Sequence, residues 1–303
     1  MTPFGPLLTQ LCDDAALFPP GNAPIADAVP AHAVHTAADH APLVGSFVFP
    51  AGRLGELAEL LAQEPYTGEL ELSLTVPTGT DAVAPALAKA ATLDSVSVTA
   101  LEIAVPAEQT VDELFTALGE ISSAKPELSV FVEVPRDERR PEILARLAQT
   151  PYSAKFRTGG IVAEAYPDEA ELAEAIGTVV AAGVPFKATA GLHHAVRNTD
   201  PETGFEQHGF LNILDAVAVA LDGGDNAAVA EALADRDGAA LASRLKDLSD
   251  ERAAEVRSRF RSYGTCSIAD PLADLLDLGL APSTVSPINS AADAVAHREG
   301  THE

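Results

Sequence analysis

The chain has 303 residues, 47% of them hydrophobic, and its formal net charge is −26. This length suits one large domain, and so negative a charge disfavours binding to nucleic acid or to an anionic membrane. No apolar run is long enough for a transmembrane helix, and the first residues lack the features of a secretory signal. The two cysteines, Cys12 and Cys266, give no disulfide framework, so we expect reduced thiols in a cytoplasmic protein.

Short β-rich runs that end in proline recur in the first half of the chain. They are SFVFP at 46–50, LELSLTVP at 70–77, TALEIAVP at 99–106 and LSVFVEVP at 128–135. Each run is followed by a stretch with helical character. Strands that alternate with helices in this way indicate βα units around a parallel sheet. A proline just past a strand end removes no ladder hydrogen bond, so it marks the start of the loop.

Four further units extend the pattern to eight. LCDDAALFPP precedes a helical stretch at 25–40, YSAKFRTGG and VPFKATAG supply strands six and seven, and RSYGTCSI supplies strand eight. The count predicts an α/β fold, a closed (β/α)8 TIM barrel with a helical insertion at 210–257 between strands seven and eight. We assign 1–281 to this single domain and 282–303 to a flexible C-terminal tail. An open doubly wound sheet, the alternative, would need a glycine-rich phosphate loop that the sequence lacks.

The period-two alternation of the strands predicts a polar barrel interior. Aliphatic side chains on one face pack against the helices, and the polar set on the other face points into the barrel. We expect four inward groups to be catalytic: Glu102, Glu133, Lys155 and Lys187. Active sites of such barrels form at the C-terminal ends of the strands. The alternative is a structural ion network that fills the barrel.

Two lysines on adjacent strands favour amine chemistry. A lysine beside a second cation in a dry pocket has its pKa lowered, and its free amine then attacks a carbonyl to form a Schiff base. A neighbouring carboxylate, Glu102 or Glu133, would move the protons.

The segments AKFRTGG and VPFKATAGLHH resemble the sixth- and seventh-strand lysine motifs of deoxyribose-phosphate aldolase, which is an aldolase-type TIM barrel. The resemblance implies that Lys155 is the Schiff-base lysine and that Lys187 lowers its pKa. This sequence departs from the motif at Phe156 and Arg157, which replace small residues, and at Glu102, where the family has an aspartate. The substrate of the family therefore does not carry over. The chain also resembles a bacterial barrel family in the segments LFPP, KFRTGG, KATAGLHH and HGFLN. This second resemblance gives no indication of what the protein does.

Residues beside the lysines predict recognition of an anion at the barrel mouth. The candidates for substrate binding are Arg157, Gly159, Gly160, Thr189, His193, His194, Arg197, Gly264 and Ser267. Arginine binds a carboxylate or phosphate through two parallel hydrogen bonds, and loops after strands seven and eight commonly hold such groups. Ordinary turn chemistry explains the glycines equally well. Local positive charge in so acidic a chain favours a small anionic substrate.

Three histidines offer a rival interpretation. His193, His194 and His208 follow strand seven, and with nearby carboxylates they would hold a divalent metal for a hydrolase or isomerase. No HExxH or paired-cysteine spacing supports that site. We therefore expect an aldolase-like lyase without a cofactor that acts on a small phosphate- or carboxylate-bearing carbonyl compound. A non-catalytic binding subunit is the remaining alternative, and the sequence leaves a homo-oligomer open.

Overall fold

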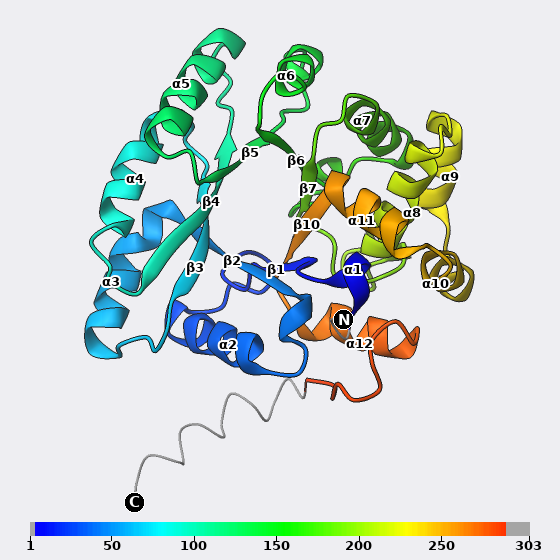
Figure 1. Ribbon diagram of the computed structural model, residues 1–303, viewed down its shortest axis with the longest axis horizontal. Coiled ribbons are helices and arrows are strands. Elements are labelled where there is room, and N and C mark those ends of the chain that lie inside the picture. Colours follow the sequence, from blue (N-terminus) through cyan, green and yellow to red (C-terminus); the bar gives the residue numbers. More distant parts are fainter. Residues whose placement is uncertain (1–3, 289–303) are drawn as a thin grey trace, which may run out of the picture.

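The computed structural model describes residues 4–288, and the rest of the predicted tail, 289–303, lies outside them. The described chain folds into a closed barrel of parallel strands in the order β1-β10-β7-β6-β5-β4-β3-β2, with helices around it, which confirms the TIM-barrel prediction (Figure 1). The barrel strands are β1 (Cys12–Asp14), β2 (Val44–Pro50), β3 (Leu70–Val76), β4 (Val96–Ala104), β5 (Ser129–Glu133), β6 (Ser153–Arg157), β7 (Phe186–Thr189) and β10 (Phe260–Thr265).

Helices follow the strands as the sequence pattern predicts. The helices outside the β7–β10 connection are α1 (Gly5–Leu8), α2 (Ile25–Ala37), α3 (Leu54–Gln63), α4 (Val83–Ala90), α5 (Val111–Ala124), α6 (Arg140–Leu147), α7 (Glu169–Ala181) and α12 (Ala269–Asp277). Short 3-10 turns lie at Ala41–Leu43, Ala51–Arg53, Thr80–Ala82 and Ala163–Ala165. Side chains fix several helix starts: Thr110 and Glu113 form a capping box on α5, and Asp168 caps α7.

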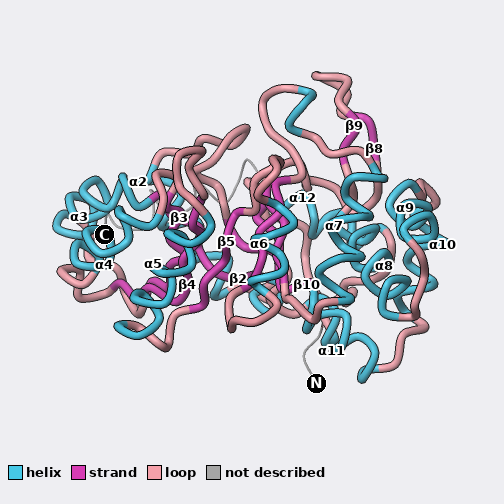
Figure 2. Tube along the Cα trace, turned by 90° about the horizontal axis from the view of Figure 1, so that it is seen from above, coloured by secondary structure: helices cyan, strands magenta, loops and turns pink. Residues whose placement is uncertain are grey.

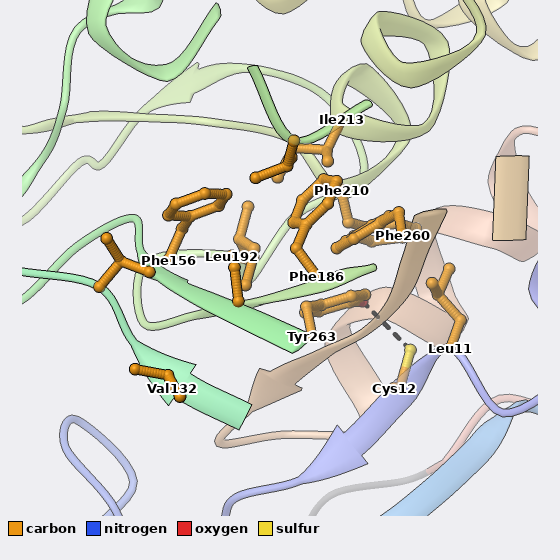
Figure 3. Packing of buried hydrophobic residues seen from close by; sticks show 14 of the residues in the cluster. Leu11, Cys12, Val132, Phe156, Phe186, Leu192, Phe210, Ile213, Phe260 and Tyr263 are labelled. Atoms are coloured by element: carbon orange, nitrogen blue, oxygen red, sulfur yellow. Dashed lines mark hydrogen bonds between the residues drawn. The ribbon is translucent and has the colours of Figure 1, made fainter. Parts of the chain in front are cut away.

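Four helices lie between β7 and β10: α8 (Phe210–Leu221), α9 (Asn226–Ala234), α10 (Gly238–Lys246) and α11 (Asp250–Arg259). They gather with α7 on one side of the barrel (Figure 1). The α8 helix packs directly against the barrel: the Phe210 ring stacks on Tyr263 of β10 with ring centroids 5.0 Å apart (Figure 3). Phe186 and Phe260 stack beside them, so the insert shares its apolar core with the barrel.

The strand register decides which side chains meet inside the barrel. On β3, Leu72 and Leu74 are fully buried, whereas Ser73 between them bonds to Glu102 across the interior. Lys155 of β6 is level with Glu133 of β5 and also with Lys187 of β7. Because side chains at one level of neighbouring parallel strands share a face, all three point inward.

The sequence did not indicate the small hairpin of β8 (Asn198–Thr199) and β9 (Glu206–Gln207). It projects beyond the C-terminal ends of the barrel strands (Figure 2). Phe205 of its turn packs on Tyr166 with ring centroids 5.5 Å apart, so the loops after β6 and β7 are in contact.

Near the C-terminal limit of the described residues, the side chain of Val285 is buried. Within residues 4–288, no helix has the length and apolar character needed to cross a membrane.

Candidate active site

A line of alternating charges crosses the barrel interior. From the mouth inward it runs through Arg157, Glu133, Lys155, Glu102, Lys187 and Asp13. Successive members lie within 2.6 to 3.2 Å of each other. The line contains as many cations as carboxylates, so these formal charges cancel. We call these six residues the charge relay.

Glu102 is the centre of the charge relay. Its Oε2 lies 2.7 Å from Lys155 Nζ, and its Oε1 lies 2.6 Å from Lys187 Nζ. The Ser73 hydroxyl also donates to Oε1, at 2.8 Å. The structure thus brings together the two lysines and the fourth-strand carboxylate that the sequence predicts to be catalytic. A shared carboxylate offsets the repulsion between the two ammonium groups.

Asp13 forms the inner end of the charge relay and is not among the four catalytic candidates that the sequence predicts. Its Oδ2 lies 2.7 Å from Lys187 Nζ and accepts from the Ser262 hydroxyl, while its Oδ1 accepts from the Ser46 backbone N–H at 3.1 Å. Gly45 makes room for it, because a β-carbon there would overlap Asp13 Oδ1. A charged residue in so short a strand was the available signal, but the adjacent Asp14 carries the same signal and instead contacts His32 at 3.0 Å.

The outer end of the charge relay opens to solvent. The side chain of Arg157 is 49% exposed, that of Glu133 22%, and that of Lys155 only 5%. Arg157 Nε lies 3.2 Å from Glu133 Oε1, and Lys155 Nζ lies 3.1 Å from Glu133 Oε2. Exposure therefore falls steadily from Arg157 through Glu133 to Lys155, whose amine is nearly buried.

The inner members of the charge relay stay ionised. Burial alone would raise the pKa of the Glu102 carboxyl, but the Lys155 and Lys187 ammonium groups outweigh burial and hold that pKa well below 4.5. Burial alone would lower the pKa of Lys187, but Asp13 and Glu102 raise it above 10.5. The pKa of Glu133 is also lowered, because Lys155 and Arg157 outweigh its burial.

These shifts give a signed prediction for stability against pH. Because the folded-state pKa of Glu102 is lowered, its contribution is complete above pH 4.5 and is lost as the pH falls below that value. The contribution of Lys187, whose folded-state pKa is raised, is complete below pH 10.5 and is lost at higher pH. We expect Glu102→Gln to flatten the acid decline of the unfolding free energy, measured by urea denaturation at a series of pH values. Glu71→Gln, an exposed position on β3, is the matched control, and an unchanged acid decline in Glu102→Gln would contradict the assignment.

The predicted glycines have mixed roles at the mouth. A β-carbon at Gly159 would lie 2.8 Å from Gly191 Cα and from Tyr166 Cε1, so this glycine allows the loops after β6 and β7 to touch. Gly160 is similarly close to Ala165. By contrast, a β-carbon at Gly264 would find only ordinary contacts, 3.5 Å from Thr189 Oγ1. A side chain at Gly264 would therefore meet no close neighbour, whereas the Gly159–Gly160 pair serves packing.

Two other anion-binding candidates are occupied by the protein itself. Arg197 is on the loop after β7, and its side chain is 8% exposed. Its guanidinium pairs with Glu169 at 2.6 Å and with Glu206 at 3.4 Å, so we leave it out of the anion site. Ser267 accepts from the Asp270 backbone N–H at 3.3 Å and holds the first turn of α12.

The three histidines do not converge on one point. His194 Nδ1 lies 3.2 Å from Asp274, and His193 Nδ1 lies 3.5 Å from the Cys266 sulfur. His208 uses both ring nitrogens, since Nε2 lies 2.8 Å from the Pro167 carbonyl oxygen and Nδ1 lies 3.2 Å from an Arg197 nitrogen. Within residues 4–288 there is no group of three or more histidine, cysteine or acidic side chains arranged to hold a metal. The geometry does not support the proposed histidine site.

The cysteines are equally unsuited to nucleophilic chemistry at rest. Burial raises the pKa of the Cys12 thiol to about 12, and this thiol donates to the Tyr263 hydroxyl at 3.1 Å (Figure 3). Burial also raises the pKa of Cys266. Both sulfurs are therefore protonated thiols at neutral pH.

Comparison of the chain with protein-family models, with curated proteins and with solved structures found no match. The functional argument therefore depends on the residues and on their geometry.

Proposed function

We propose that this protein is an aldolase-like lyase that acts on a small carbonyl compound bearing a phosphate or carboxylate. The observation that carries the proposal is the bridge made by Glu102, whose two oxygens contact amines on two adjacent strands. The resemblance to deoxyribose-phosphate aldolase implies the two lysines on strands six and seven, and that family has an aspartate where this chain has Glu102. The barrel fold is compatible with such chemistry.

Lys155 is the proposed nucleophile because it is the amine nearer to solvent. Lys187 is 1% exposed and is held between two carboxylates, which leaves its amine no access to a substrate. Lys155 also contacts Glu133, which is partly exposed and suited to exchange protons with a bound molecule. Lys187 keeps Glu102 ionised and oriented toward Lys155.

The covalent step follows from these roles. The neutral Lys155 amine adds to the carbonyl carbon and gives a carbinolamine. Glu133 returns a proton to the carbinolamine oxygen, which leaves as water and yields an iminium ion. The iminium then takes up the electron pair of the bond between its α- and β-carbons and becomes an enamine, while Glu133 accepts the proton of the β-hydroxyl, which becomes the carbonyl of the released fragment. This cleavage, or its reverse, is the lyase reaction. Arg157 binds the anionic group of the substrate through its exposed guanidinium.

Borohydride trapping tests this function. The protein is incubated with a panel of small carbonyl compounds, such as glyoxylate, pyruvate and glycolaldehyde phosphate, and is then reduced with borohydride. We expect a stable secondary amine at Lys155, located by peptide mass spectrometry. Lys125→Met, which removes an exposed lysine paired with Glu127, should leave trapping unchanged. An absence of adducts across the panel would favour the non-catalytic binding subunit.

A further inference from the structure

The resting charge relay raises a problem for the proposed function on which this inference rests. Lys155 Nζ lies 2.7 Å from Glu102 Oε2 and 3.1 Å from Glu133 Oε2, so the Lys155 ammonium group is ion-paired with two carboxylates. An ammonium ion has no lone pair and cannot attack a carbonyl. The proton must therefore leave Lys155 before the reaction begins.

Glu133 is the acceptor that the geometry favours. Glu102 is 2% exposed and retains the Lys187 ammonium, which opposes its protonation. Within the described part of the chain, Glu133 has Arg157 as its only cation partner besides Lys155, at 3.2 Å and through a single nitrogen, Nε. Arg157 therefore lowers the pKa of Glu133 together with Lys155.

The guanidinium of Arg157 is engaged less than those of Arg139 and Arg244. Within residues 4–288 its guanidinium has one partner, whereas Arg139 donates to Asp137 and to backbone carbonyls, and Arg244 bridges two aspartates. Its two terminal nitrogens remain available to an anion at the exposed mouth. Arginine binds a carboxylate or phosphate through those two nitrogens.

We propose that an anion bound by Arg157 triggers transfer of a proton from Lys155 to Glu133, so that the amine becomes nucleophilic only when an anionic substrate is present. The direction in which the anion shifts the proton follows from its distances to Glu133 and to Lys155. The transfer removes a negative charge from Glu133 and a positive charge from Lys155. An anion on Arg157 lies nearer to Glu133 than to Lys155, so it favours loss of the negative charge more than it opposes loss of the positive one. Chemical specificity is thereby built into the activation step.

The trigger is separable from the substrate in an experiment. A neutral aldehyde, glycolaldehyde, is trapped with borohydride in the presence or absence of inorganic phosphate, with sodium chloride at equal ionic strength as the salt control. In the unaltered protein we expect phosphate to accelerate trapping at Lys155 by about tenfold, which corresponds to one pKa unit. Arg157→Gln and Glu133→Gln should each abolish the response to phosphate. Arg136→Gln, which also removes an arginine paired with a glutamate, should retain it.

The outcomes separate this inference from the proposed function. Acceleration that depends on both Arg157 and Glu133 supports the trigger. Trapping at Lys155 that is equally fast without phosphate, or acceleration that persists in Arg157→Gln, overturns the trigger and leaves the Schiff-base function intact. An absence of trapping with every carbonyl compound overturns both. Circular dichroism of each variant confirms that it is folded.

Discussion

Lys155→Met is expected to abolish the reaction while the barrel remains folded. The variant removes the proposed nucleophile, and methionine retains most of the apolar stem. Its former partners each keep a cation, because Glu102 still contacts Lys187 and Glu133 still contacts Arg157. We expect borohydride trapping and turnover to fall by more than about a hundredfold. A single positioned acid or base already contributes about that factor, and loss of the nucleophile should cost at least as much. Mass spectrometry and steady-state kinetics provide the two measurements.

The thermal unfolding midpoint of the same variant serves as the control for folding. Lys89→Met removes a lysine on α4, away from the barrel interior, and should leave both trapping and stability unchanged. A Lys155→Met protein that still forms an adduct, now at Lys187, would show that the nucleophile had been assigned to the wrong strand.

Lys187→Met, unlike Lys155→Met, is expected to lower the free energy of unfolding by a large amount. Lys187 is buried between Asp13 and Glu102, and no other cation of the charge relay contacts Asp13. Among residues 4–288, the substitution leaves the buried Asp13 carboxylate with two hydrogen-bond donors, the Ser262 hydroxyl and the Ser46 backbone N–H. Loss of one partner from a buried ion pair costs about 3–5 kcal/mol, measurable by urea denaturation.

A double variant separates this electrostatic cost from simple loss of packing. In Lys187→Met/Asp13→Asn the uncompensated charge is gone, so the double variant should be more stable than Lys187→Met alone. The matched comparison is Lys187→Met/Asp14→Asn, which neutralises the neighbouring aspartate that contacts His32. If Asp13→Asn and Asp14→Asn rescue Lys187→Met equally, the ion pair with Asp13 is not the source of the cost.

The barrel could be predicted from the sequence because each unit repeats the same local signals. Proline ends such as Pro77 and Pro106 follow β-rich runs, and helical stretches fill the intervals. Alternation then placed Glu102, Lys155 and Lys187 on inward positions. These are local properties of single strands, and they survive folding because a parallel barrel keeps every strand in the same orientation.

The rest of the site depends on contacts between distant strands. Asp13 reaches Lys187 only because β1 pairs with β10 and closes the barrel. Nothing local distinguishes it from Asp14. Arg197 illustrates the reverse case: its charge suggested an anion site, but Glu169 and Glu206 neutralise it in the folded chain. Charge pattern alone does not reveal which cations are already paired.

The lack of a side chain at Gly45 also bears on how this barrel changes over evolutionary time. A β-carbon at position 45 and the Asp13 carboxylate would occupy the same space, so position 45 cannot accept a larger residue while that carboxylate stays in place. In sequences descended from a common ancestor, a larger residue at 45 should be accompanied by a smaller one at 13. The loss of that aspartate should in turn be followed by the loss of the lysine at 187, so that three distant positions are inherited as a unit.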